Sequence, residues 1–294
     1  MKGMREIRTR IRAVKNTAQI TRAMELVASS KMKKAQDSAL GSRTYAYALA
    51  DLLHALTKQV SWDSIEHPFL KQREIRHRGV LLITPDKGLC GSLNQNLVKA
   101  AMQMPRETKF IVMGQKGVQF LSRNRSEVLG HFTCPDVITF KQVQEIVHFL
   151  VDAFESGKID TVEVLFPRFK NTLVQETVMR RLLPMVDFEA ELQLLYQWMG
   201  VDPQNLVTDD REFIVEPGGR TILERLPLLF LKKTLYQIIL EAKASEHSAR
   251  MVAMKGATDN AETLIQNLQL EYNKARQAGI TQEIVEITAS QNAQ

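Results

Sequence analysis

Apolar side chains recur every three or four residues over long tracts at both ends of the chain. Near the beginning, the repeat runs through Met4, Ile7, Ile11, Val14 and Ala18, and then shifts to Ile20, Met24 and Val27. Near the end, it runs through Leu228, Leu231, Leu235, Ile238, Ala242, Ser245, Ala249, Val252, Leu264, Leu268, Ala275, Ile280, Ile284 and Ile287. Such spacing lines up one face of an α-helix. We therefore predict a long amphipathic helix at each end.

The placement of proline supports the same prediction. All nine prolines lie in the middle of the chain, which leaves residues 1–67 and 228–294 without any. Because proline lacks a backbone N–H and clashes with the preceding turn, its absence permits uninterrupted helices. Small side chains in both repeats allow two helix backbones to approach closely. We expect the two ends to pair as one antiparallel coiled coil, with a bend at Gly256 and a change of packing at Gly279.

Between these ends, short apolar runs alternate with helical patterns. We expect helices over residues 92–104, 115–124 and 141–159, and strands over residues 79–84, 109–114, 161–169 and 173–184. The last two strands form a hairpin around Lys170 and Asn171. The piece before residue 141 is irregular, and residues 187–217 are the hardest to assign, although REFIVEP within them suits an edge strand or a connector. Strands that alternate with helices favour a largely parallel sheet with both faces covered.

The predicted fold class is α/β plus a long α-helical antiparallel coiled coil. A small Rossmann-like α/β domain is inserted between the N- and C-terminal helices, which pair with each other. We assign residues 1–67 to the N-terminal helix, 68–209 to the central α/β domain, and 210–294 to a connector and the C-terminal helix. A chain of 294 residues with 44% hydrophobic side chains is long enough to bury such a core.

The composition of the chain limits the cellular compartments in which we expect the protein to work. Two cysteines, Cys90 and Cys134, cannot form a disulfide framework, so we expect a reducing environment. No run of 18 apolar residues predicts a transmembrane helix. The opening MKGMREIRTRIR lacks the apolar core and cleavage site of a secretory signal, and it continues without a break into the helical repeat. We expect these residues to belong to the mature protein.

The positive charge is concentrated at one end. The whole chain carries a formal charge of +6, whereas residues 1–36 contain ten Lys or Arg and two Asp or Glu, a local net of +8. A basic helix face favours an acidic protein partner, nucleic acid or a membrane surface. A merely solvated helix face is the other interpretation of the same pattern.

The loop TPDKGLCGSLN, residues 84–94, stands where an α/β fold binds ligands, after the first strand. It does not match a phosphate-binding loop, because Lys87 precedes the glycines and the dinucleotide spacing is absent. Cys90 has no histidine nearby in sequence to act as a base, and the six histidines show no metal-ligand spacing. We therefore predict no catalytic residue, no cofactor and no metal site, and we interpret the loop as a contact surface.

Three stretches closely resemble the gamma subunit of F-type ATP synthase, in the same order and with the same separation. They are REIRTRIRAVKNTAQITRAMELVASSKMKKAQ (5–36), ITPDKGLCGSLNQNL (83–97) and ASEHSARMVAMKGATDNAETLIQNLQLEYNKARQAGITQEIVEI (244–287). The first and last are highly specific, and the resemblance covers the whole chain. It implies a non-catalytic rotor subunit, one copy per complex, that transmits c-ring rotation to the catalytic beta subunits, and the reverse during ATP hydrolysis.

The resemblance also implies partners. The paired terminal helices form a shaft inside the ring of alpha and beta subunits. The α/β domain is a foot that binds the epsilon subunit and the membrane c-ring. Departures from the family pattern are Ser92 after DKGLCG, the glycine-rich EPGGRT and the polar tail ASQNAQ. Since residues 190–220 contain no cysteine pair, a bacterial rather than a chloroplast form is expected, peripheral on the cytoplasmic face of the inner membrane.

Individual contact residues follow by resemblance to the family motifs. The positions implied to meet the beta-subunit lever are Met24, Lys31, Lys33, Lys34, Asp86, Lys87 and Cys90. Those implied to meet the beta-subunit catch are Arg250, Arg276, Gln277 and Thr281. In the foot, Phe213 stands at the family's tyrosine position facing the c-ring, and Glu216 follows it.

Two other functions compete with a rotor. A basic coiled-coil nucleic-acid-binding protein would explain the charged end, but residues 1–44 contain no aromatic side chain for base stacking and no recognised binding motif. A small nucleotide-dependent enzyme would explain the α/β domain, but the phosphate-binding loop is missing. The rotor assignment expects no nucleic acid among the partners.

Overall fold

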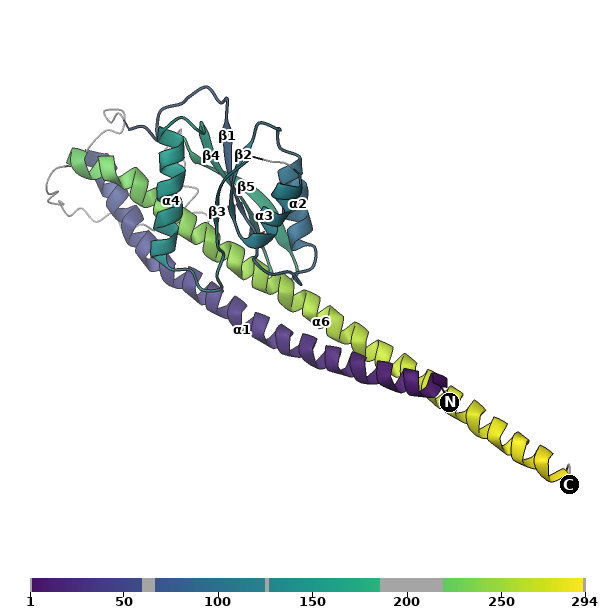
Figure 1. Ribbon diagram of the computed structural model, residues 1–294. Coiled ribbons are helices and arrows are strands. Elements are labelled where there is room, and N and C mark those ends of the chain that lie inside the picture. The colour runs from purple at the N-terminus through teal and green to yellow at the C-terminus, as the bar shows by residue number, and fades with distance from the viewer. Residues whose placement is uncertain (1, 60–66, 125–126, 186–218, 293–294) are drawn as a thin grey trace. The chain divides into compact units, whose positions relative to one another are not determined.

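The computed structural model describes residues 2–59, 67–124, 127–185 and 219–292. The elements are α1 (Lys2–Gln59), β1 (Arg78–Ile83), α2 (Leu93–Met102), β2 (Lys109–Met113), α3 (Gln115–Arg123), β3 (Val128–Phe132), α4 (Phe140–Glu155), β4 (Thr161–Phe169), β5 (Gln175–Leu183) and α6 (Gly219–Asn292) (Figure 1). The chain divides into two compact units. Residues 1–30 and 250–294 form the helical unit, and residues 31–249 form the mixed unit.

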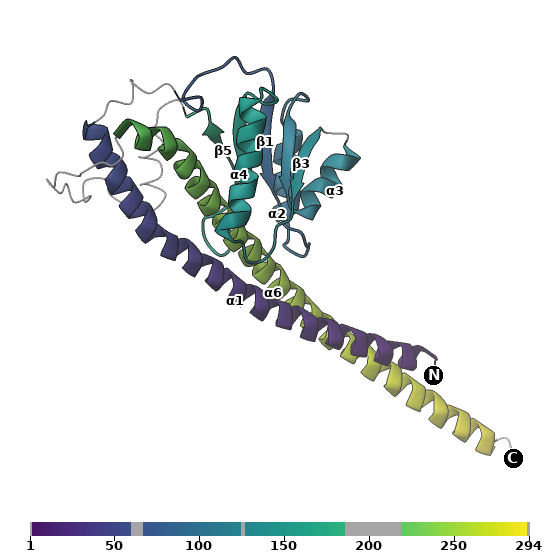
Figure 2. The ribbon, with the colours of Figure 1, turned by 60° about the vertical axis from the view of Figure 1, so that its left-hand side comes forward.

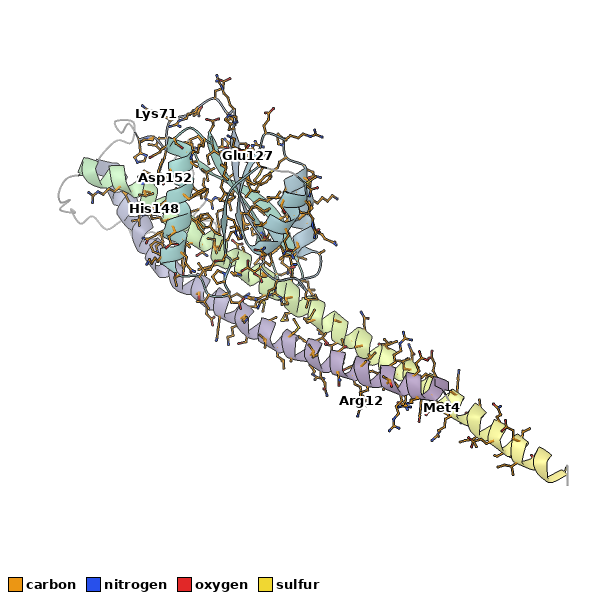
Figure 3. The ribbon with its side chains drawn as sticks, in the orientation of Figure 1. Met4, Arg12, Lys71, Glu127, His148 and Asp152 are labelled. Atoms are coloured by element: carbon orange, nitrogen blue, oxygen red, sulfur yellow. The ribbon has the colours of Figure 1, made fainter. Side chains whose placement is uncertain are left out.

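The helical unit is an antiparallel pair made from the start of α1 and the end of α6 (Figures 1 and 2). The hydroxyls of Thr21 and Thr258 lie 2.8 Å apart, and Arg22 pairs with Glu262 at 3.9 Å. Figure 3 labels Met4, whose Cε would lie 3.5 Å from a Cβ added at Gly279. These contacts join the two ends of the chain and confirm the predicted antiparallel pairing.

Most of the buried and half-buried positions in the helical unit follow heptads. In α1 they include Met4, Ile7, Ile11, Val14, Ala18, Thr21 and Ala28, and in α6 Met254, Thr258, Ala261, Ile265, Leu268, Tyr272, Ala275 and Gly279. An unbroken seven-residue repeat keeps the seam facing the partner when two helices supercoil. We call this set of residues the seam. It ends at Gly279, because residues 280–288 are all exposed.

The predicted shift of the α1 repeat is wrong at two positions. Ile20 and Val27 are 61% and 53% exposed, because each precedes a seam residue and is rotated about 100° away from it. Leu264, Ile280, Ile284 and Ile287 are likewise exposed in α6. The prediction allowed a straight helix to drift from the heptad, whereas the paired helices do not drift.

The mixed unit contains a five-stranded sheet with the order β3-β2-β1-β4-β5. Strands β1 to β4 are parallel, and β5 pairs antiparallel with β4. One face packs against α4 and α6, with Leu150, Phe154, Leu231 and Leu235 in its core. The other face packs against α2 and α3, through Leu97 and Leu121 among others. The Rossmann-like fold class, the hairpin and three predicted helices are therefore confirmed.

Two features differ from the sequence-based expectations. The irregular piece before residue 141 contains β3, an edge strand whose residues are half-buried or exposed and include Gly130 and His131, so it lacks an apolar run. Helix α6 begins ahead of Pro227, which it contains. It also continues through Gly256 without interruption. The domain boundaries stay predictions, and REFIVEP lies outside the described residues.

Candidate functional site

The carboxyl ends of β1, β2 and β3 are tied together by Thr84 and Asp86. The Asp86 carboxylate accepts hydrogen bonds from the backbone N–H groups of Gln115 (2.9 Å) and Cys134 (3.1 Å). The Thr84 hydroxyl accepts one from the N–H of Gly117 at 2.9 Å. A Cβ at Gly114, whose φ is +105°, would stand 1.8 Å from the Thr84 carbonyl oxygen, so only glycine fits there. The Asp86 side chain therefore links the loops that follow β1, β2 and β3 at the carboxyl edge of the sheet.

The DKGLCG loop turns its side chains in opposite directions. Cys90 is 1% exposed, and its Sγ accepts a hydrogen bond from Asn94 Nδ2 at 3.2 Å. Lys87 is exposed. Leu89 has a left-handed backbone (φ +62°) and a 61% exposed side chain. A partner that binds this loop can therefore contact the side chains of Lys87 and Leu89, whereas the side chain of Cys90 is buried beneath the loop.

Leu89 and Val137 were both missed by the sequence reasoning. Val137, in the loop after β3, is 80% exposed. An isolated apolar residue in a loop gives no periodic signal, so only the fold reveals that its side chain is unsheltered. In the sequence, the only indication for Leu89 is that it lies between Lys87 and Cys90, two predicted contact residues.

A network of charged side chains lies beside the loop after β3, here called the β3–α4 loop (residues 133–139). Lys31 of α1 donates to Asp136 at 2.6 Å. Buried Lys243 of α6 donates to Glu246 and to the Cys134 carbonyl, both at 2.9 Å. The Lys31 ammonium holds the pKa of Asp136 below its ordinary value of 3.8.

Burial governs the other titrations in this network. It raises the pKa of the Cys134 thiol to about 11, so the thiol stays protonated at neutral pH. Burial also disfavours the charged form of Lys243, but the neighbouring Cys134 and Glu246 outweigh it, and the pKa of Lys243 is raised. Lys243 therefore remains an ammonium group inside the mixed unit, and Cys134 is unsuited to nucleophilic chemistry.

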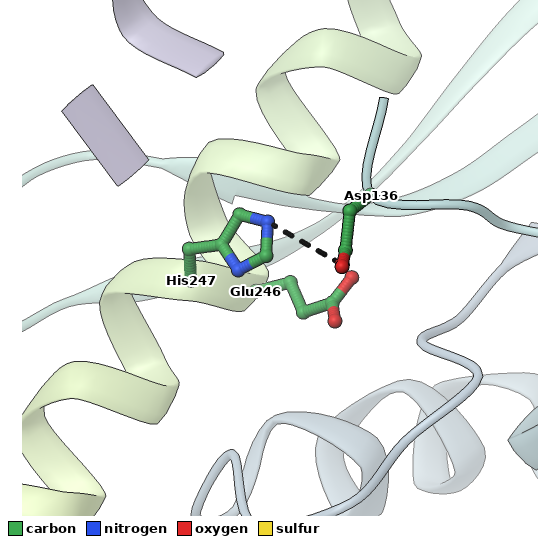
Figure 4. A group of neighbouring side chains, drawn as sticks. All are labelled: Asp136, Glu246 and His247. Atoms are coloured by element: carbon green, nitrogen blue, oxygen red, sulfur yellow. Dashed lines mark ion pairs between the residues drawn. The ribbon is translucent and has the colours of Figure 1, made fainter. Parts of the chain in front are cut away.

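Asp136, Glu246 and His247 place ligand-type atoms within 4.8 Å of one another (Figure 4). A metal ion there would compete with the two lysines that already hold the carboxylates, at 2.6 and 2.9 Å. The Nε2 atom of His247 lies 4.0 Å from Asp136. We therefore assign the group as an ion-pair network. This network was also missed by the sequence reasoning, because its members come from α1 (Lys31), the β3–α4 loop (Asp136) and α6 (Lys243, Glu246 and His247).

The remaining predicted contact residues divide by exposure. Lys33, Lys34, Arg276, Gln277 and Thr281 are exposed, and the Thr281 hydroxyl donates to the Gln277 carbonyl. Met24 is half-buried and Arg250 is 9% exposed. Phe213 and Glu216 lie outside the described residues. The mixed unit thus brings Lys31, Asp86 and Cys134 to one loop, whereas Lys33 and Lys34 stand free of that network.

The described residues form an antiparallel helix pair and an α/β sheet, and the charged side chains beside the β3–α4 loop are paired with one another. The family model described as ATP synthase matches residues 3–293, which gives the class of protein. The ATP synthase gamma chain of Opitutus terrae is 48% identical over 293 residues, covering 100% of this chain and 99% of that one. The gamma chain of Methylacidiphilum infernorum is 40% identical, with 100% and 99% covered. This chain belongs to the ATP synthase gamma-chain family.

Solved structures agree with this fold. The central stalk and c-ring of the Tetrahymena thermophila mitochondrial ATP synthase include a chain that is 25% identical, with a TM-score of 0.59, covering 81% of this chain and 99% of that one. A chain of the Euglena gracilis mitochondrial enzyme is 18% identical, with a TM-score of 0.67 and coverages of 99% and 94%, and supports the fold alone. None of these comparisons supports a nucleic-acid-binding function.

None of the helices that the structure describes contains a stretch long and apolar enough to cross a membrane.

Proposed function

We propose that this chain is the central-stalk rotor of an F-type ATP synthase and transmits rotation between the c-ring and the catalytic beta subunits. The observation that carries the proposal is the strict heptad seam that joins the two ends of the chain, within a family of ATP synthase gamma chains. Two helices held by such a seam resist twisting better than one, because seam contacts must shear before either helix turns alone. A chain built in this way carries torque without chemistry of its own.

The partners follow from this function. The helical unit turns inside the ring of alpha and beta subunits, and the mixed unit binds epsilon and the c-ring, with one copy of this chain per complex. The chain then lies on the cytoplasmic face of a bacterial inner membrane, as a peripheral protein. The basic start of α1, with a net charge of +8 over residues 1–36, suits acidic surfaces on those partners.

The contacts with beta are proposed to be weak. Lys33, Lys34 and Lys87 are exposed candidates for the lever, joined by Met24, Lys31, Asp86 and Cys90 of the same motifs. Arg276, Gln277 and Thr281 are exposed candidates for the catch, with Arg250 beside the seam. An exposed ion pair contributes only ~0–1 kcal/mol. Such contacts suit a part that must release each beta subunit in turn.

Co-purification tests the proposal directly. An affinity-tagged copy of the full chain, expressed in its source organism, should co-purify with alpha, beta and epsilon subunits and with ATPase activity. The complex should be found with washed membranes and require c-ring contacts to stay there. Recovery of the chain alone, or bound to nucleic acid with a steep salt dependence, would contradict the rotor assignment.

A further inference from the structure

Lys31 differs from the two other lysines of its motif. Its side chain is 41% exposed, and its Nζ lies 2.6 Å from Oδ2 of Asp136. Lys33 and Lys34, two and three residues further along α1, are exposed. A charge-assisted hydrogen bond this short fixes both side chains. Lys31 is thus engaged within its own chain at the place where the family resemblance alone implies a contact with beta.

Asp136 faces α6 as well as α1. Figure 4 shows its carboxylate beside Glu246 and His247 of α6, with His247 Nε2 at 4.0 Å. Lys243, one turn earlier, donates to Glu246 and also to the Cys134 carbonyl, so α6 holds the β3–α4 loop at a second point. The two carboxylates and two ammonium groups balance in charge. Balanced, mutually hydrogen-bonded charges are the arrangement in which partial burial is tolerated.

The loop itself is firmly anchored to the sheet. Its Cys134 N–H donates to Asp86, which also accepts from the N–H of Gln115 at the start of α3. On its other side, the loop leads into α4 through Thr139, whose hydroxyl and backbone form a capping box with Gln142. A side chain fixed to this loop is therefore fixed to the sheet.

We propose that Asp136 is a positioning residue that clamps the mixed-unit part of α1, through Lys31, to the β3–α4 loop and to α6, so that these parts of the two long helices turn with the sheet. The proposal rests on the proposed rotor function. It reassigns Lys31 from a contact with a stationary partner to a permanent joint inside the rotor. Lys33 and Lys34 remain available for the beta subunit.

Covalent bridging distinguishes a permanent joint from a contact that must release. The test variant is Lys31→Cys/Asp136→Cys in a chain whose buried Cys90 and Cys134 are replaced by alanine, and the reagent is a cleavable bismaleimide. Unbridged, the assembled complex lacks the joint and should show lower coupled ATP synthesis than the cysteine-free parent. Bridging should restore synthesis toward the parent rate. Loss of synthesis on bridging, recovered on cleavage, would overturn the proposal, and so would a bridge without effect.

A matched control uses Asp37→Cys/Asp136→Cys in the same background. Asp37 is exposed and lies outside the proposed contacts. It follows Lys31 by six residues, so about 240° of helix rotation and about 9 Å of helix rise separate the two side chains. The reagent should not bridge this pair, and coupled synthesis should stay at the low value of the unbridged test variant. Restoration in the control would show that reagent attachment, rather than the joint, changes the rate.

Hydrogen exchange of the free chain tests the joint without the complex. Asp136→Asn and Lys31→Gln should each raise exchange of the amides around Lys31 by up to about fivefold, the factor equivalent to an exposed ion pair. The double variant should exchange no faster than either single variant, because both remove the same bond. Lys33→Gln should change nothing. Additive effects, or none, would overturn the joint, whereas failure to assemble with partners would overturn only the rotor function.

Discussion

Helix α6 has two environments along its length. Within the mixed unit, residues 242–249 are buried on every side. Within the helical unit, from residue 258 onward, only the seam is buried or half-buried, and residues 280–288 are all exposed. One uninterrupted helix therefore serves first as a core element and then as half of a two-helix pair. Because a two-helix pair buries one stripe per helix, side chains there should be individually less important to stability than in the mixed unit.

The ion pairs of the two units also differ in exposure: the pair in the mixed unit is buried, and the pair in the helical unit is exposed. In the mixed unit, Lys243 and Glu246 are 4% and 6% exposed and bond each other at 2.9 Å. In the helical unit, Arg22 and Glu262 are 71% and 56% exposed and stand 3.9 Å apart. A solvated pair of that kind contributes ~0–1 kcal/mol, and removing one partner of a buried pair costs several times more. We therefore expect the ion pair between Lys243 and Glu246 to matter more for the stability of the mixed unit than the pair between Arg22 and Glu262 does for the helical unit.

The largest expected effect comes from leucine truncation in the two stretches of α6. Leu235→Ala removes a fully buried side chain from the core that α6 forms with the sheet, and should cost ~2–5 kcal/mol of unfolding free energy. Leu268→Ala, at a seam position that is 4% exposed, should cost near the lower end of that range, because the neighbouring helix can relax into the space. Urea unfolding, with hydrogen exchange to separate the two units, measures both.

An equal loss at the two leucines would show that the seam packs as tightly as a globular core. That result would break the comparison, since the two stretches of α6 would then differ in exposure alone. Leu264→Ala, at an exposed position four residues earlier, is the matched control and should change the free energy by less than ~0.5 kcal/mol.

Sequence periodicity predicts these environments only in part. The heptads of α1 up to Ala18 correctly identify a buried or half-buried face, and the spacing from Leu231 to Ala249 identifies a buried one. Apolar spacing gives the wrong face at Ile20 and Val27, which are exposed, because the neighbouring Thr21 and Ala28 occupy the seam instead. A threonine carries no apolar signal, although its methyl group packs and its hydroxyl can bond within the seam.

The charged network could not be predicted from the sequence. Lys31 and Asp136 are 105 residues apart, and no local pattern connects them. The DKGLCG motif correctly draws attention to the sheet edge, but that Asp86 and Cys90 face inward depends on how the loops after β1, β2 and β3 meet. Family resemblance supplies the identity of such residues, whereas the direction of each side chain comes only from the fold.

The next effect concerns the polar pair in the seam. Thr21 and Thr258 share a 2.8 Å hydrogen bond, and their hydroxyls also lie near the carbonyls of Ala18 and Met254. Thr258→Val should cost about 1 kcal/mol, the net value of one hydrogen bond. The double variant Thr21→Val/Thr258→Val should recover most of that loss, because two apolar side chains can pack in place of the pair.

Recovery of stability in the double variant should come with loss of register. A buried polar pair specifies which residues stand opposite each other, at some cost in stability. Chemical cross-linking between cysteines placed at Met4 and Gly279, which face each other, should therefore become less selective. If selectivity is unchanged, the heptad seam alone sets the register.

A smaller and stabilising effect is expected at Gly256. A Cβ added there meets no atom within 4 Å, and the residue lies inside α6. Gly256→Ala should stabilise the helical unit by up to ~1 kcal/mol, because alanine has the higher helix propensity. Gly130→Ala in β3 is the contrasting variant, since its Cβ would stand 2.7 Å from the Phe149 ring and should destabilise the mixed unit. Thermal unfolding of the two variants measures the opposite signs.

The smallest effect on stability is expected at the exposed end of α6. Arg276→Ala/Gln277→Ala changes two exposed side chains, and the free chain should unfold within about 0.5 kcal/mol of the parent. In the assembled complex, the same variant should lower coupled ATP synthesis, because polar contacts proposed for the catch are removed. Lys274→Ala, an exposed neighbour outside that set, is the control and should leave both measurements unchanged. A double variant with normal synthesis would remove these two residues from the proposed contacts, while a large loss of stability would mean that exposed positions of the helical unit matter as much as its seam.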